Sequence, residues 1–126
     1  MKLFSIEEAN ALLPTVRVKV AAMSRAYSRV SASQEGSREV AELAKTTGGG
    51  HMPNGGVYVA ALLALAASAG ELEALGVQLK DYERGLIDFP AMRDGRVVLL
   101  CWQLGEGDEI EWWHDLETGF AGRQPL

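Results

Sequence analysis

The stretch that decides the fold is GLIDFPAMRDGRVVLLCWQLGEGDEIEWWH, residues 85–114. Its apolar residues come in short runs separated by Gly and Asp, which is typical of strands joined by tight turns. Asp94 and Gly95 give a two-residue hairpin signal, because both residues tolerate the positive φ angles of a type I′ turn. We therefore expect strands over 86–92 and 97–104. The second is the most apolar strand and should be central.

The sheet should gain further strands on both sides of this hairpin. Residues 77–81 and 109–114 alternate between apolar and polar side chains, as half-buried strands do. Trp112 and Trp113 are adjacent, so one indole should face the core and the other should face away from it. The tail, 115–126, is rich in glycine and is expected to be irregular. The pattern predicts an antiparallel meander of three or four strands.

The N-terminal part of the chain has a helical pattern. Ser5 and Glu8 form a capping box. In it the Ser5 hydroxyl accepts the backbone N–H of Glu8, and the Glu8 carboxylate accepts the backbone N–H of Ser5. Pro14 lacks the N–H that a helix interior needs, but it suits the first turn of a new helix. We therefore predict a short helix over 6–13, a bend, and a long helix over 14–45.

Two long helices should pack together along matching apolar seams. Their apolar side chains recur at intervals of four and three, the spacing of a coiled coil. The seam of the first helix is Val16, Val20, Met23, Tyr27 and Val30. The seam of the second, predicted over 57–75, is Tyr58, Leu62, Leu65, Ala69 and Leu72. Gly36 and the serines before it weaken the first pattern and predict a break there.

A glycine-rich loop, residues 46–56, should connect these helices. It lacks the Lys-Ser/Thr ending of a phosphate-binding loop, so we interpret it as a plain connector with a solvated His51. The predicted class is α+β in a single domain. Residues 1–76 would form a long antiparallel helical hairpin with a short N-terminal helix, packed on the small meander of residues 77–126.

The charge pattern excludes some functions. The net charge is -5, and residues 77–126 carry ten acidic against five basic side chains, which argues against nucleic-acid binding. The apolar run over 60–69 is too short to span a bilayer, and the N-terminus lacks a signal-peptide pattern. A lone Cys101 in an apolar run fits a buried thiol in a reducing compartment. We expect a cytoplasmic protein.

Five polar residues of the C-terminal part are the candidates for a binding site. They are Asp88, Glu106, His114, Glu117 and Arg123. His114 with Asp88 and Glu106 has the ligand chemistry of a divalent metal such as zinc or manganese, although the spacing fits no known metal motif. The alternatives are acid–base work by Asp88 and Glu106, or carboxylates that only keep the protein soluble.

Arg123 has two interpretations of its own. Glycines flank Phe120 and let the tail turn tightly, so that the ring can anchor the C-terminus. Arg123 would then pair with Asp88 or Glu117. Alternatively, its guanidinium binds an external carboxylate or phosphate in bidentate fashion. No cofactor is expected, apart from a divalent metal under the binding hypothesis.

Several segments resemble a prokaryotic family of unknown function, catalogued as domain of unknown function 2203. These segments cover most of the chain outside the loop: Phe4–Pro14, Gly76–Val77, Lys80–Asp81, Arg84–Pro90, Cys101–Trp102, Gly105–Glu106, Trp113–His114 and Gly119–Gln124. The resemblance implies the plan of paired helices followed by an acidic tail, and it assigns no catalyst. The interrupted stretch 31–37 departs from the sustained charged helix expected of such proteins.

Two classes of function follow from these patterns. In the first, leftover apolar surface on the helical hairpin builds a homodimer, and the protein is an interaction or scaffold domain. In the second, the acidic edge of the sheet binds a small molecule or a divalent metal, with or without catalysis. The sequence favours the first class and assigns no reaction.

Overall fold

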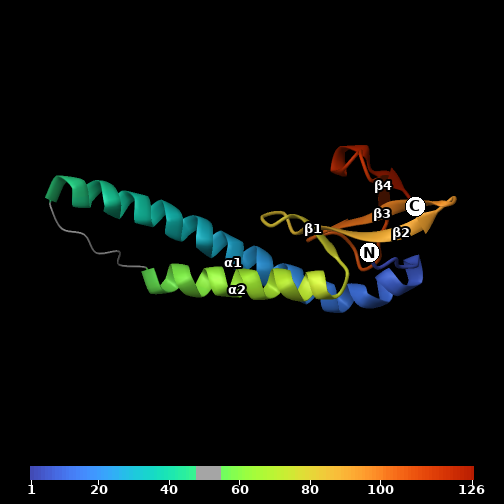
Figure 1. Ribbon diagram of the computed structural model, residues 1–126, viewed down its shortest axis with the longest axis horizontal. Coiled ribbons are helices and arrows are strands. Elements are labelled where there is room, and N and C mark those ends of the chain that lie inside the picture. The colour runs from blue at the N-terminus through green and yellow to red at the C-terminus, as the bar shows by residue number, and fades with distance from the viewer. Residues whose placement is uncertain (48–54) are drawn as a thin grey trace.

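The structure is a computed structural model that describes the backbone of residues 1–47 and 55–126 and the side chains of 1–32, 56 and 58–126. Two helices precede a five-stranded antiparallel sheet, so the class is α+β (Figure 1). The helices are α1, Ile6–Thr47, and α2, Gly55–Ala74. The strands are β1, Gln78–Asp81; β2, Leu86–Arg93; β3, Arg96–Gln103; β4, Trp112–Asp115; and β5, Gln124–Pro125. A 3₁₀ turn, η1, spans Phe120–Gly122.

Helix α1 begins with the predicted capping box. The Glu8 backbone N–H donates to Ser5 Oγ at 3.0 Å, and the Ser5 N–H donates to Glu8 Oε1 at 3.1 Å. The backbone N–H of Ser5 and, second to it, the Ser5 side chain hydrogen-bond to the Glu8 carboxylate and lower the pKa of that carboxyl. Both N–H groups would otherwise lack an intrahelical partner, so the box fixes where α1 starts.

The predicted division of α1 at Pro14 is wrong. The helix runs unbroken from Ile6 to Thr47, and no break occurs at Gly36. Pro14 has no backbone N–H, so one carbonyl of the preceding turn loses its hydrogen bond. Because Pro14 is exposed, that carbonyl can bind water instead. Leu13 and Val16, on either side of the proline, are fully buried. Packing of that buried face keeps the chain helical through the proline, and α1 curves in this region (Figure 1).

The two helices lie side by side and run in opposite directions (Figure 1). Most of the predicted α1 seam is buried, while Tyr27 is half-buried and stacks on Tyr82 with ring centroids 5.8 Å apart. The α2 seam is partly wrong, because Ala61 is buried where Leu62 was expected. Alanines surround this point of α2, so the apolar pattern alone does not select one face.

The connection between the helices is shorter than predicted. Helix α1 extends to Thr47 and α2 begins at Gly55, which places both ends of the expected loop inside helices. His51, expected to be solvated, lies outside the described residues. No helix of the described ranges is long and apolar enough to cross a membrane.

The sheet is a meander in the order β1-β2-β3-β4-β5, with β3 at its centre as predicted. It has five strands instead of three or four, because part of the tail forms β5 beside β4. The β2–β3 turn has positive φ at both Asp94 (52°) and Gly95 (78°), as a type I′ turn requires. The local signals therefore predicted the central hairpin correctly.

Strand β4 is shorter than predicted and begins at Trp112 instead of Glu109. The cause is a contact with α1: the Ile110 backbone N–H donates to Asn10 Oδ1 at 2.8 Å. Ile110 is buried there and belongs to the core shared with the helices. The segment before β4 is thus tied to α1 and does not pair with β3.

The two faces of the sheet have different cover. The helices pack on one face, whose buried side chains include Ile87, Phe89, Val98, Leu100, Trp102 and Trp113. The opposite face carries Asp88, Leu99, Cys101, Trp112 and His114 by alternation. Neither α1 nor α2 lies over this second face, and the C-terminal segment with η1 curls over it instead (Figure 1).

Candidate metal centre

Three side chains with metal-ligand chemistry meet on the face that the tail covers. Asp88 comes from β2, Cys101 from β3 and His114 from β4. The register places Cys101 directly opposite Asp88, and it pairs His114 with Leu99, two residues from Cys101. Their exposed fractions are 1%, 1% and 2%, so all three are buried.

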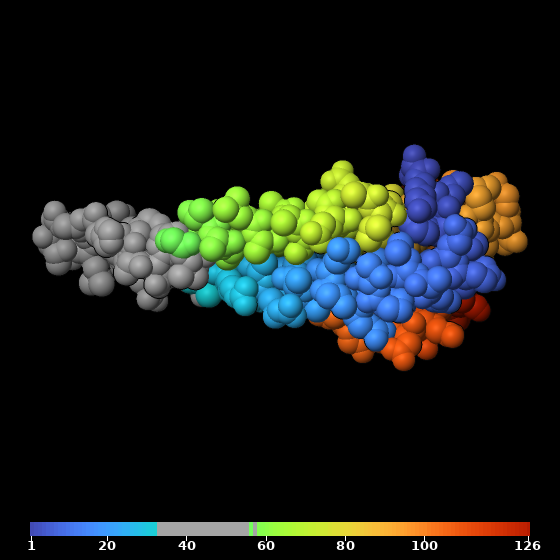
Figure 2. Space-filling model, turned by 90° about the horizontal axis from the view of Figure 1, so that it is seen from below, coloured from blue at the N-terminus to red at the C-terminus, as the bar shows by residue number. Residues whose placement is uncertain are grey.

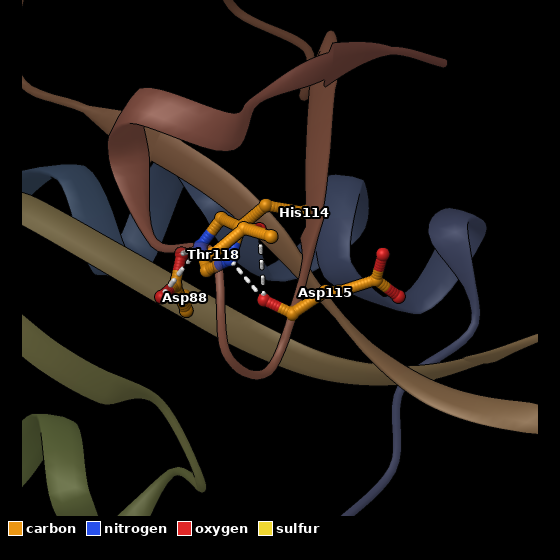
Figure 3. Close-up of polar contacts among 4 residues, drawn as sticks. All are labelled: Asp88, His114, Asp115 and Thr118. Atoms are coloured by element: carbon orange, nitrogen blue, oxygen red, sulfur yellow. Dashed lines mark hydrogen bonds and ion pairs between the residues drawn. The ribbon is translucent and has the colours of Figure 1, made fainter.

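Two hydrogen bonds fix the orientation of the His114 ring (Figure 3). Nδ1 lies 2.7 Å from the backbone carbonyl oxygen of Asp115. A carbonyl can only accept, so Nδ1 carries a proton and donates it. On the other side of the ring, Nε2 lies 3.1 Å from both carboxylate oxygens of Asp88. The Asp115 carbonyl therefore directs Nε2 at Asp88.

A single proton must lie between His114 and Asp88. Neither an unprotonated Nε2 nor a carboxylate can donate, so one of the two groups has to carry that proton. Burial raises the pKa of the Asp88 carboxyl, and attraction by His114, hydrogen bonds from His114 and Cys101, and the charge of Lys80 only partly offset this effect. Without another ligand, the site is a buried acid–imidazole pair that shares one proton.

Cys101 completes the group as a third possible ligand. One ligand atom from each of Asp88, Cys101 and His114 lies within 4.8 Å of the others. Burial, reinforced by the charge of Asp88, raises the pKa of the Cys101 thiol to about 12, while the Arg123 charge lowers it. The thiol is therefore protonated at neutral pH unless a cation displaces the proton.

The geometry argues against a cysteine nucleophile. A thiol of this kind needs a histidine nitrogen that removes its proton. Both nitrogens of His114 are engaged with other groups, the Asp115 carbonyl and the Asp88 carboxylate. The sulfur atom also has almost no contact with solvent, since Cys101 is 1% exposed. The group resembles a ligand set more than a catalytic triad.

The C-terminal tail is held over this face by Arg123. Its guanidinium donates to Glu106 Oε2 at 2.6 Å and lies over the Trp112 ring, 4.8 Å from the centroid. Two guanidinium groups lie over the Phe120 ring, that of Arg123 at 4.7 Å and that of Arg84 at 4.4 Å from its centroid. Glu106 is itself fixed, because its Oε1 accepts the Gln103 backbone N–H at 2.8 Å. The side chain of Arg123 is only 10% exposed, so the pair with Glu106 is a partly buried clamp.

The five candidate residues fall into three separate places. Asp88 and His114 are in contact, whereas Glu106 and Arg123 form the tail clamp. Arg123 thus pairs with Glu106 and with neither of the expected partners, Asp88 and Glu117. Glu117 is exposed and lines a shallow surface cavity with Thr118 and others. The structure therefore does not bring all five together.

Cys101 was expected only as a buried thiol and was not among the candidate site residues. The signal was available, however, in the hairpin turn at Asp94 and Gly95. A two-residue turn pairs Arg93 with Arg96, and counting back five positions on each strand pairs Asp88 with Cys101. Combining the turn with the list of ligand residues would have found this part of the site.

The chain was compared with known proteins by family model, by sequence and by structure. The family model described as an uncharacterized conserved protein, DUF2203, matches residues 2–126. The chain belongs to this family. Comparison with curated proteins and with solved structures gave no match. The DUF2203 match includes both helices and all five strands, so Asp88, Cys101 and His114 lie within the segment that defines membership.

In this DUF2203 member, a small cavity opens beside the three buried side chains. Its volume is about 110 Å³. Asp88 and His114 form its polar floor, Lys80 lines it from β1, and Gly119 lines it from the tail. Its remaining lining is apolar: Leu86, Leu99, Leu116 and Phe120. The cavity gives a small molecule a place next to the ligand atoms.

Proposed function

We propose that this chain is a metal-binding protein in which Asp88, Cys101 and His114 hold a divalent transition metal, with zinc as the best fit. The observation that carries the proposal is the convergence of a carboxylate, a thiol and an imidazole, all buried, on three adjacent strands. A structural role would be served as well by apolar residues of similar volume, because a buried ion pair contributes little net stability.

The ligand types favour zinc over the common alternatives. Calcium and magnesium prefer sites built entirely from oxygen, and copper(I) prefers sulfur ligands. A set of one nitrogen, one sulfur and one oxygen is within the usual range for zinc. Three protein ligands also leave a fourth position open, as in catalytic zinc sites, and the adjoining cavity gives access to it.

The distances support binding with little rearrangement. Ligand atoms about 2.0–2.3 Å from a tetrahedral zinc ion lie roughly 3.3–3.8 Å from one another. His114 Nε2 and the Asp88 oxygens are 3.1 Å apart, and the three ligand atoms lie within 4.8 Å. The Asp115 carbonyl accepts the Nδ1 proton and so orients the ring, as a carbonyl or carboxylate usually does for a metal-bound histidine.

Metal titration of the full-length, untagged protein tests this proposal. After treatment with a chelator, the protein should bind one equivalent of Zn²⁺ or Co²⁺ per chain. Free Zn²⁺ at a hundred times its Kd should raise the free energy of unfolding by about 2.7 kcal/mol. With Co²⁺, a near-ultraviolet charge-transfer band should report the bond to the Cys101 thiolate.

Matched variants separate ligands from neighbours. Cys101→Ser should lose the charge-transfer band, and His114→Gln and Asp88→Asn should lose stabilisation by zinc. Asp115→Asn is the control, because that carboxylate sits beside His114 but pairs with Arg96 at 3.0 Å on the surface. Asn at position 88 can donate to Nε2, so Asp88→Asn should still fold. Equal metal binding by the Asp88→Asn and Asp115→Asn variants would disprove the assignment.

We infer self-association as a second function, favoured by the outer surface of α2. Figure 2 looks onto the helical side of the molecule, where α2 lies open beside α1. On α2, Val59, Leu62 and Leu63 are 53%, 38% and 68% exposed. No charged residue occurs between positions 57 and 70. An apolar helix face without charges is suited to a second copy of the same face.

Substitution of Leu63 tests the homodimer. Wild-type protein should sediment at twice the mass of one chain, and Leu63→Glu should weaken the dimer at least tenfold, because it buries a charge in an apolar interface. Val18→Glu is the matched control, since Val18 is 69% exposed on α1. Leu65 is unsuitable, because it packs against the chain's own core. A monomeric wild-type protein would rule out this function.

A further inference from the structure

A cavity lies next to the proposed metal centre, and its lining combines one cationic side chain with apolar ones. Its polar lining comes from Lys80, Asp88 and His114, and four apolar side chains line the remainder. Lys80 makes no ion pair among the described side chains (1–32, 56 and 58–126). Within the site, its positive charge acts on the Asp88 carboxylate, which the proposed metal would neutralise.

The charges at this site can be counted once a metal is bound. A divalent cation with the Cys101 thiolate and the Asp88 carboxylate is neutral, because His114 binds as the neutral imidazole. Lys80 then leaves one positive charge at the cavity. A ligand with a single negative charge would balance it, whereas a cationic ligand would be repelled.

The size and lining of the cavity narrow the class of ligand further. A cavity of about 110 Å³ compares with the roughly 30 Å³ that one water molecule occupies in the liquid. It therefore corresponds to about four water-sized groups, the size of a molecule with about four or five non-hydrogen atoms. Phosphate would need several hydrogen-bond donors, but the walls are Leu86, Leu99, Leu116 and Phe120. A short apolar chain is a better match to these walls than further oxygen atoms.

We propose that the cavity binds a short aliphatic carboxylate, whose carboxylate group occupies the open metal position near Lys80 and whose alkyl group packs on the leucines and Phe120. This inference rests on the proposed metal centre and adds the substrate class to it. Lys80 would act by attraction of the carboxylate, and the tail residues Leu116 and Phe120 would exclude water from the alkyl group.

A cobalt-loaded protein tests this inference, because the visible spectrum of Co²⁺ changes when a ligand enters its coordination sphere. Propionate is the probe, and propionamide is its uncharged control of nearly the same shape. Propionate should change the spectrum saturably, and propionamide should not. Inorganic phosphate should bind more weakly than propionate, since the cavity offers it few donors.

Two lysine variants make the test specific. In protein already saturated with cobalt, Lys80→Gln should weaken propionate binding about tenfold, because one positive charge is removed from the cavity. Lys2→Gln removes the same charge beside Phe4, on the helix-covered side, and should bind propionate as wild type does. Equal propionate affinity in wild type and Lys80→Gln would overturn the inference while the metal centre stands. Failure to bind cobalt would overturn both.

Discussion

Gly85→Ala is expected to lower the free energy of unfolding by about 3–4 kcal/mol. Gly85 has φ of +63° in the turn between β1 and β2, a conformation that costs alanine about 1 kcal/mol or more. A Cβ there would also lie 2.8 Å from both Leu104 Cβ and Val20 Cγ1. Overpacking of this kind typically costs a further 1–3 kcal/mol. Urea denaturation followed by circular dichroism measures the change.

Gly95→Ala is the control for this effect. Gly95 also has positive φ, +78°, but a Cβ at this position would meet nothing within 4 Å. The free energy of unfolding of the Gly95→Ala variant should therefore fall only by the conformational cost of positive φ, about 1–2 kcal/mol. The difference between the two variants measures how tightly the β1–β2 turn packs against Val20 of α1. Equal losses would show that this turn does not dock on the helix.

Gly122→Ala is expected to raise the rate at which thiol reagents label Cys101 in the native protein by about ten- to a hundredfold. A Cβ on Gly122 would overlap the Thr118 side chain, at 2.6 Å from Oγ1, so the turn of the tail could not keep its shape. Such overlap typically costs about 1–3 kcal/mol. We expect the tail to relieve it by opening locally. Each 1.4 kcal/mol gives a tenfold change in the open population.

The rate of Cys101 labelling in native protein measures this opening, with Cys101→Ser as the blank. Ala121→Val adds bulk to the exposed neighbour of Gly122 and should label as wild type does. The global free energy of unfolding should change less than the labelling rate suggests, because the core on the helical side does not include the tail. If Cys101 of the Gly122→Ala variant were labelled at the wild-type rate, the tail would not be what shields the thiol.

Local signals predicted much of this fold correctly. The capping box at Ser5 and Glu8 and the turn at Asp94 and Gly95 act within a few residues, so their outcome depends little on the rest of the chain. The central position of the apolar strand β3 also followed from its composition. The α+β class rests on the change from helical to alternating periodicity, which is likewise a local property.

The errors concern features that distant contacts decide. Pro14 predicts a helix boundary from its own chemistry, yet the burial of Leu13 and Val16 keeps α1 continuous. The start of β4 was misplaced because Ile110 bonds Asn10, a hundred positions away. In α2, alanines lie on several sides of the helix, so the apolar pattern could not show whether Ala61 or Leu62 faces the core.

The candidate site divides in the same way. The sequence by itself determined that Asp88 and His114 were ligand-type residues in strands, whereas the pairing of Cys101 with Asp88 came from the register of the folded hairpin. Only the tertiary structure decided that β4 brings His114 onto the same face and that Arg123 clamps the tail through Glu106. Residue type and local register are encoded within a few positions, whereas the partner of a long side chain depends on which elements pack together.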